Sequence, residues 1–226
     1  MNKISNLKNL IQITIEYRNY LKQSGISFNE EGFPIFAEEM FLTDWPKLVI
    51  PYSQRKNWRV KNPQKTLICF FDSDCHLYPR LTKVLDEIDE YKKYMGVIGM
   101  DVTITDDMDE EWQAVIELVN QMFLAILAVN GVKIVINTRS ATLDLARVFN
   151  NFPQQVMAAS GFLGCNIIGD EKDFSYLEKI LYLLPSKLVL YGKQDKIVEK
   201  QLDVMGIDYR VYLDFHRLCK EVPYVR

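Results

Sequence analysis

Residues 66–74 read Thr-Leu-Ile-Cys-Phe-Phe-Asp-Ser-Asp, an apolar run that ends abruptly in a polar cluster. Amphipathic stretches of helix length separate this run from four later ones, so the pattern predicts strands that alternate with helices in a parallel sheet. The carboxyl ends of parallel strands share one edge, and we expect a binding site where their polar clusters meet. The four later clusters are Gly99-Met100-Asp101-Val102-Thr103, Val135-Ile136-Asn137-Thr138-Arg139, Ala158-Ala159-Ser160-Gly161 and Leu190-Tyr191-Gly192-Lys193.

The hydrophobic periodicity predicts one α/β domain over residues 1–226. Residues 1–65 would hold an N-terminal helix (4–23) and an irregular wrapping segment, and residues 66–226 the regular β/α repeats. We favour a distorted or partial β/α barrel over an open parallel sheet, because closure would gather more polar strand ends around one axis. Strands are expected near 66–72, 96–102, 133–138, 155–160, 187–192 and 208–214, with weaker candidates at 33–36 and 47–52. Helices are expected at 77–94, 109–130, 142–149, 173–184 and 194–205.

Composition narrows the class of protein. With 48% hydrophobic and 25% charged residues, the chain has enough apolar material for a substantial core. A net charge of −3 gives no overall positive field toward nucleic acid or anionic lipid. The longest apolar stretch, 122–129, is far shorter than a membrane span, and the first residues lack a signal-peptide pattern. We therefore expect a cytoplasmic protein without a membrane span.

The four cysteines form no C-x-x-C pair, and the only histidines are His76 and His216, so a dedicated zinc site is not expected. Cys69 and Cys219 fit buried, reduced cysteines. Cys75 beside His76 offers a nucleophile and base, although sequence neighbours rarely have the geometry that activation requires.

Acidic residues dominate the first two strand ends. Asp72 and Asp74 flank Ser73, so they point to the same side of an extended strand end, and Asp101 follows on the next strand. Together the three carboxylates would bind a divalent cation or separate into an acid and a base. Alternatively, Asp74 caps the following helix and Asp101 pairs with a cation such as Arg139.

The later strand ends carry groups suited to an anion. Asn137 and Arg139 adjoin a predicted helix amino terminus, where backbone N–H groups are free to bind phosphate or carboxylate. Thr103, Ser160 and Lys193 complete the candidate ligand-binding residues. His216, after the last strand, is the better placed histidine for acid–base chemistry, and we group it with Asp72 and Asp101 as candidate catalytic residues.

The segment 53–65 is locally basic around Trp58. It would hold phosphate or stack a base, or else be a solvated connector with one tucked tryptophan. Its basic residues are Arg55, Lys56, Arg59, Lys61 and Lys65.

Several motifs in this order resemble DUF4417, a family of domains of unknown function often met in phages, plasmids and other mobile elements. They are Leu48-Val49-Ile50-Pro51-Tyr52, Phe70-Phe71-Asp72, Gly96-Val97-Ile98-Gly99-Met100-Asp101-Val102-Thr103, Asn130-Gly131-Val132-Lys133-Ile134-Val135 and Leu188-Val189-Leu190-Tyr191-Gly192-Lys193. The chain has Gly99-Met100 where the family usually has Ser-Pro. The resemblance implies a mobile-element context, with host cytoplasm as the location if a phage encodes the protein, but no established reaction.

Two functions follow as hypotheses. The first is an enzyme that acts on a nucleotide or other phosphate-bearing substrate at the strand ends. The second is a non-catalytic phage or mobile-element factor that binds a host or defence protein through aromatic residues of the N-terminal third. Nucleic-acid binding is not favoured, because no recognition-helix signature stands out. The aromatic residues in question are Phe33, Phe36, Phe41, Trp45, Tyr52 and Trp58.

Overall fold

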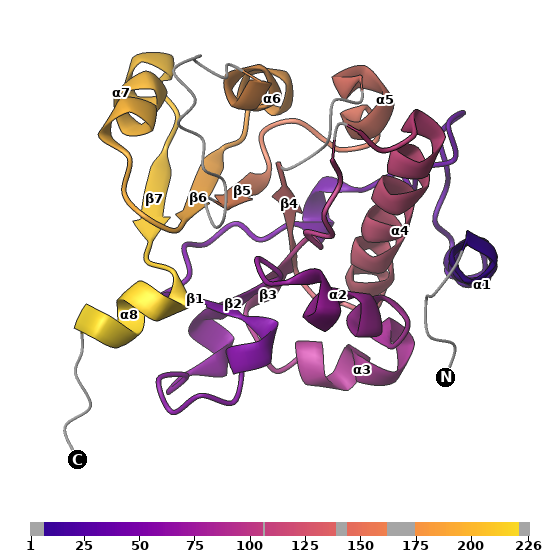
Figure 1. The fold of residues 1–226 in the computed structure, drawn as a ribbon, viewed down its shortest axis with the longest axis horizontal. Coiled ribbons are helices and arrows are strands. Elements are labelled where there is room, and N and C mark those ends of the chain that lie inside the picture. The colour runs from indigo at the N-terminus through magenta and orange to yellow at the C-terminus, as the bar shows by residue number, and fades with distance from the viewer. Residues whose placement is uncertain (1–6, 106, 139–143, 162–174, 222–226) are drawn as a thin grey trace.

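The structure is a computed structural model that describes residues 7–105, 107–138, 144–161 and 175–221. Seven parallel strands pair in sequence order. The chain is therefore an α/β protein with a barrel-like sheet, as predicted (Figure 1). The strands are β1 (Leu48–Pro51), β2 (Thr66–Cys69), β3 (Gly96–Ile98), β4 (Ile134–Asn137), β5 (Met157–Gly161), β6 (Lys187–Tyr191) and β7 (Tyr209–Tyr212).

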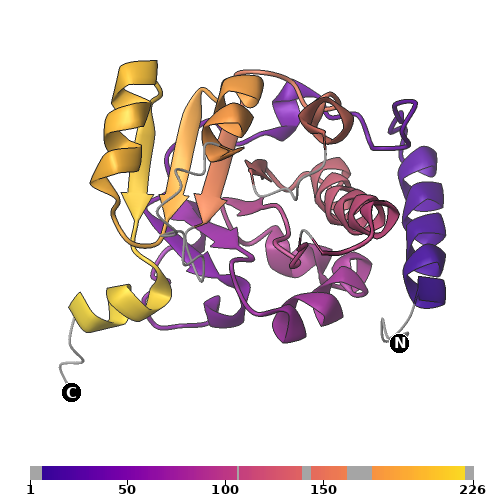
Figure 2. The same cartoon turned by 45° about the horizontal axis from the view of Figure 1, so that its top comes forward.

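Helices cover the outside of the sheet, and the N-terminal helix α1 forms a further layer outside α4 (Figure 2). No helix joins β1 to β2; two short 3-10 turns, η2 (Tyr52–Gln54) and η3 (Pro63–Lys65), lie in that connection instead. This exception positions the site described below. The helices are α1 (Leu7–Gln23), α2 (Asp74–Leu81), α3 (Val84–Tyr91), α4 (Glu110–Val129), α5 (Leu145–Phe149), α6 (Ser175–Leu183), α7 (Lys196–Met205) and α8 (Phe215–Glu221).

Side chains that alternate along the strands build two separate cores. The interior core lies inside the barrel, and the outer core lies between the strands and the helices. In β2, Leu67 and Cys69 point into the barrel, whereas Ile68 points outward to the helices. The interior cluster gathers one face of every strand, as closure of a sheet requires. Its buried members are Leu42, Val49, Leu67, Cys69, Phe71, Ile98, Val135, Met157, Ala159, Val189 and Tyr191.

The two edge strands are tied through the segment that precedes β1. Tyr212 on β7 donates its hydroxyl hydrogen to the carbonyl oxygen of Pro46 at 2.8 Å. The Arg210 guanidinium lies 4.7 Å from the ring centroid of Trp45. These contacts bring β7 next to the chain that enters β1, so the sheet is nearly closed rather than open.

Helix α4 is the central helix of the outer core. Its N-cap residue, Asp109, accepts hydrogen bonds from the N–H groups of Glu111 and Trp112. Such a cap satisfies donors that the first turn leaves unpaired. By length and hydropathy, α4 is the one helix among the described residues that could cross a membrane. However, 72% of its most apolar 18-residue stretch is buried inside the protein.

Two details differ from the sequence predictions. The helix expected at 77–94 is split into α2 and α3. Pro79 lies inside α2, which ends two residues later at Leu81, and each half buries its own apolar residues. Of the two weak strand candidates, the second is β1, whereas 33–36 forms only a single bridge, between Phe28 and Pro34. Proline cannot donate to a ladder.

Candidate functional site

Aromatic side chains fill the barrel axis at the carboxyl ends of the strands. The ring of Phe71 stacks on that of Tyr191, with centroids 5.5 Å apart. Gly161 faces the Phe71 ring so closely that a Cβ atom on residue 161 would lie 2.5 Å from that ring. The Tyr191 hydroxyl oxygen accepts a hydrogen bond from the N–H of Phe215 at 3.0 Å. The strand ends described here therefore do not surround an open site on the axis.

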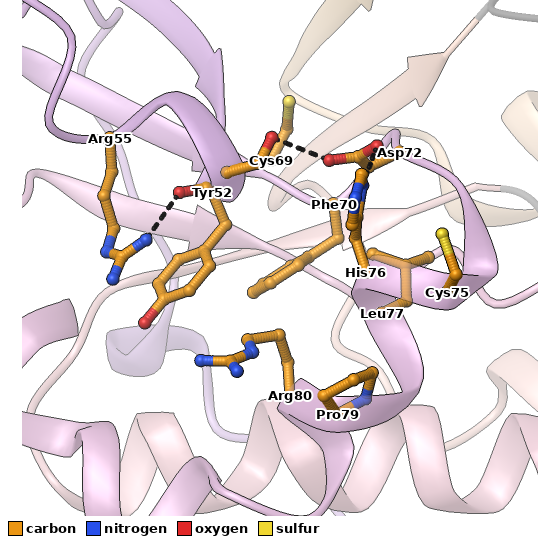
Figure 3. A pocket seen from close by; sticks show the side chains of 11 residues that line it. Tyr52, Arg55, Cys69, Phe70, Asp72, Cys75, His76, Leu77, Pro79 and Arg80 are labelled. Carbon is orange, nitrogen blue, oxygen red and sulfur yellow. Dashed lines mark hydrogen bonds and ion pairs between the residues drawn. The ribbon is translucent and has the colours of Figure 1, made fainter.

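An open pocket of about 330 Å³ lies beside the axis, at the carboxyl ends of β1 and β2 (Figure 3). The 3-10 turn after β1 forms one wall, and the loop after β2 with helix α2 forms the other. This volume lies at the lower end of the range for small-molecule sites. The lining residues are Tyr52, Ser53, Arg55, Cys69, Phe70, Asp72, Cys75, His76, Leu77, Pro79 and Arg80.

Asp72 and His76 form a hydrogen-bonded pair at this pocket. Helix α2 begins at Asp74, so its first turn carries His76 back toward Asp72, and His76 Nδ1 lies 2.9 Å from Asp72 Oδ1. Ser53 donates its hydroxyl hydrogen to Asp72 Oδ2 at 2.7 Å, and the Ser73 N–H donates to Oδ1 at 2.8 Å. The carboxylate is therefore held from both walls of the pocket.

These bonds set the charge of Asp72. Partial burial raises the pKa of its carboxyl, but the hydrogen bonds from His76, Ser53 and the Ser73 N–H outweigh burial, so the pKa lies below its ordinary value. An ionised carboxylate only accepts hydrogen bonds, so Nδ1 of His76 must carry the hydrogen between them. In the neutral ring, Nε2 is then left as the acceptor.

Ser73 and Cys75 lie beside the pair, but they do not complete a nucleophile triad. The Ser73 hydroxyl is 3.2 Å from His76 Nδ1, the same nitrogen that faces Asp72, and 3.2 Å from Cys75 Sγ. A triad needs the nucleophile on one ring nitrogen and the carboxylate on the other. The Cys75–His76 option from the sequence therefore gains no contact from this geometry. Acid–base chemistry through Nε2 is what the pair can provide.

Two arginines, one from each wall, lie against one aromatic ring of the pocket. The guanidinium carbon of Arg55 lies 4.0 Å from the Tyr52 ring centroid, and that of Arg80 lies 5.7 Å from it. Arg55 pairs with Glu90 at 3.2 Å, and Arg80 pairs with Glu87. These pairs fix the guanidinium groups but use only part of their five N–H donors. Both arginines can still bind an anion.

Tyr52 and Phe70 form the floor between these arginines and the Asp72–His76 pair (Figure 3). Their rings stack with centroids 5.7 Å apart. Burial and the nearby Glu87 carboxylate raise the pKa of the Tyr52 hydroxyl, which therefore stays neutral. The pocket thus combines an acid–base pair, an aromatic floor and guanidinium donors.

The three acidic side chains predicted to cluster are used separately, which corrects that expectation. Asp74 accepts hydrogen bonds from the N–H and hydroxyl groups of Thr103, at 3.0 and 3.1 Å. Asp101 accepts one from Asn137 Nδ2 at 3.1 Å. No group of three or more His, Cys, Asp or Glu side chains in the described ranges could hold a metal ion.

The other predicted residues lie on different elements. Asn137 also donates to the Met100 carbonyl oxygen at 2.9 Å, and Ser160 is buried in β5. Lys193 is exposed after β6, and His216 is exposed on α8. Arg139 lies outside the described residues. Of the candidate catalytic and ligand-binding residues that the structure describes, only Asp72 lines the pocket, beside the Cys75 and His76 of the nucleophile hypothesis.

A second polar cavity, of about 20 Å³, lies under α4 at the carboxyl ends of β3 and β4. Glu117 is buried there and accepts a hydrogen bond from Gln121 Nε2 at 3.0 Å. Burial raises the Glu117 pKa to about 7, against the opposing hydrogen bonds from Gln121 and Asn120. The volume suits one water molecule rather than a substrate.

The aromatic residues of the predicted protein-contact surface belong largely to the core. Phe33, Phe36, Phe41 and Tyr52 are buried, and Trp45 is half-buried. Trp58, by contrast, is 50% exposed. The proposed surface is therefore not a contiguous set of aromatic anchors.

Sequence reasoning missed most of the pocket. One usable signal was the four-residue spacing of Asp72 and His76 across a helix start, which brings such side chains together. Arg55 stood out only as one of several basic residues. Nothing local pairs it with Tyr52 and Arg80, because β1 and the helix-free connection after it bring these residues together.

Comparison with known protein families, curated proteins and solved structures finds no match to this chain. The resemblance to DUF4417 stays a prediction, and the site's own geometry carries the argument for function.

Proposed function

We propose that this protein is an enzyme that performs acid–base chemistry on a small phosphate-bearing molecule, such as a nucleotide, bound in the pocket at the ends of β1 and β2. The observation that carries the proposal is the contact between His76 Nδ1 and Asp72 Oδ1, 2.9 Å long, at the edge of a pocket of about 330 Å³. A carboxylate that orients an imidazole in this way is a recurring arrangement for proton transfer.

Each member of the pair has a distinct role. Asp72 fixes the ring and stabilises the positive charge that the ring gains when it accepts a proton. His76 Nε2 removes a proton from the substrate or an attacking water, and returns it to the leaving group. Because an imidazole nitrogen can both accept and donate a proton, it serves both steps.

The two arginines support a phosphate-bearing substrate. Planar guanidinium groups match phosphate oxygens, and Arg55 and Arg80 are held by Glu90 and Glu87 rather than free to reorient. The aromatic floor of Tyr52 and Phe70 would contact a base or a sugar. In the context that the DUF4417 resemblance implies, this enzyme would work in the cytoplasm of a host cell on behalf of a phage or mobile element.

The test is conversion of phosphate-bearing compounds followed by ³¹P NMR, which reports a change at phosphorus whichever bond breaks. The panel is AMP, ADP, ribose 5-phosphate and 4-nitrophenyl phosphate, with and without Mg²⁺. Wild type should convert at least one compound, and His76→Ala should lose that activity. His216→Ala is the matched control, since it removes the other exposed histidine. No conversion of any compound, or equal activity of His76→Ala and wild type, would contradict the proposal.

A further inference from the structure

The connection between β1 and β2 concentrates positive charge. From residue 45 to residue 71 the chain has no acidic residue, although its net charge is −3. The rest of the chain is therefore acidic in excess, and this segment has the opposite net charge. The basic residues between positions 45 and 71 are Lys47, which precedes β1, and Arg55, Lys56, Arg59, Lys61 and Lys65 in the connection.

The connection leads directly out of the pocket. Arg55 lines the pocket, and the chain then returns to the amino end of β2 through a series of tight turns. Tyr94 donates its hydroxyl hydrogen to the Arg55 carbonyl oxygen at 3.0 Å, and Gln64 Nε2 donates to the Lys93 carbonyl oxygen at 2.9 Å. The segment is thus fixed to the end of α3 and is an ordered surface.

Its side chains divide between core and solvent. Val60 packs against the outer core, whereas Trp58, two residues earlier, is 50% exposed. The Arg59 guanidinium carbon lies 4.4 Å from the Trp58 ring centroid. The exposure of Trp58 contradicts the alternative prediction from the sequence, a connector with one tucked tryptophan. Lys56, Lys61 and Lys65 are all exposed.

We infer that residues 53–65 form a binding surface for single-stranded nucleic acid, with Trp58 stacking on a base and Lys56, Lys61 and Lys65 contacting phosphates. Basic side chains interleaved with an exposed aromatic ring are what sequence-tolerant single-strand binding requires. Since the surface begins at the pocket, the pocket's substrate would be a nucleotide at or near the end of a strand. This last step rests on the proposed function; the binding surface itself does not.

A single strand fits better than a duplex. Bases in a duplex are stacked on each other and hidden from a tryptophan ring, whereas an unpaired base offers its face. A duplex would gain from the lysines alone. Trp58 is thus the residue that separates the two ligands.

The experiment is fluorescence anisotropy with a fluorescein-labelled 15-nucleotide oligo-dT and a labelled 15-base-pair duplex, at two salt concentrations. Wild type should bind the single strand more tightly than the duplex. Trp58→Ala should weaken single-strand binding about fivefold or more, and Trp58→Phe should retain most of it. Lys56→Glu with Lys61→Glu should weaken binding about tenfold or more and flatten its salt dependence.

The matched control is Lys196→Glu with Lys200→Glu, which makes the same change of charge at exposed positions on α7. It should bind like wild type. Absence of binding, equal affinity for strand and duplex, no effect of Trp58→Ala, or equal weakening in the control would each overturn the inference.

The two proposals fail in different ways. If the oligonucleotide binds but no phosphate compound is converted, only the enzymatic proposal fails. If a compound is converted in a His76-dependent way but the oligonucleotide does not bind, only the nucleic-acid surface fails.

Discussion

The carboxyl ends of β1 and β2 and those of β3 and β4 lie along the same edge of the sheet, and both carry polar side chains. At β3 and β4, helix α4 covers the outer face and leaves a cavity of about 20 Å³. At β1 and β2, the connection without a helix leaves a pocket of about 330 Å³. Polar strand ends are thus common to both places, and the covering element decides which of them can receive a ligand.

The same contrast extends to the side chains. Asp101 and Asn137, at the covered strand ends, bond to each other and to the chain around them. Asp72 and His76 bond to each other at the edge of open space. The first pair joins elements of the fold, whereas the second lines the pocket.

The largest effect is expected from His76→Ala. Turnover should fall about 10²- to 10⁴-fold, the usual contribution of a positioned acid–base group. The unfolding free energy should change little, because the side chain is 59% exposed. Turnover of the most responsive phosphate compound and urea unfolding measure the two quantities. A large loss of unfolding free energy with unchanged turnover would contradict this. His76 would then have a structural role, like the residues at the carboxyl ends of β3 and β4.

Leu124→Ala tests how tightly α4 closes the other region. Leu124 is buried and lines the small cavity. Removing its side chain should lower the unfolding free energy by about 2–5 kcal/mol, because a packed helix collapses only partly onto the space. Urea unfolding gives the value. A loss below about 1 kcal/mol would show that α4 is not closely packed there.

Glu117→Gln should change how stability depends on pH. The Glu117 pKa is about 7 in the folded protein against 4.5 for the ordinary group. The folded state therefore holds this proton more tightly, and its contribution to stability is lost as pH rises from about 4.5 through about 7. That loss amounts to about 3 kcal/mol at most.

The glutamine variant should lack this pH dependence. Its unfolding free energy relative to wild type, measured by urea unfolding, should therefore be higher at pH 8 than at pH 4. Glu16→Gln, at an exposed position on α1, is the control and should follow wild type. Parallel pH curves for Glu117→Gln and wild type would contradict the burial of an ionisable carboxyl under α4.

Asp101→Asn should have the smallest effect. Asp101 is half-buried and accepts a hydrogen bond from Asn137 that asparagine can still accept. We expect a loss of about 1 kcal/mol or less in unfolding free energy and turnover within about twofold of wild type. A loss of turnover as great as that of His76→Ala would move the active site to the covered strand ends.

Much of the fold could be predicted because it depends on local patterns. The apolar runs and helical periodicities predicted six strands and the long helix at 109–130, which is α4. The split of the helix expected at 77–94 into α2 and α3 was missed. Near closure of the sheet was favoured correctly, but the contact of Tyr212 with Pro46 joins residues 166 positions apart and has no local signature.

The site was harder to predict for a physical reason. Asp72 was found because it ends a strand, and parallel strand ends meet at one edge. Which strand ends stay open depends on the volumes of side chains such as Phe71 and on the coverage by α4, and both are tertiary properties. Asp101 was predicted for the same reason, but it ends the strand that the helix covers.

The most direct test of the central claim is the tautomer of His76, read from long-range ¹⁵N–¹H correlation spectra at a pH where both rings are neutral. The chain has only two histidines, so His216 on α8 provides the second signal and His76→Ala assigns them. The account predicts that His76 carries its hydrogen on Nδ1, toward Asp72, and that inorganic phosphate shifts its signals but not those of His216. A hydrogen on Nε2 of His76, or signals of His76 that phosphate leaves in place, would contradict it.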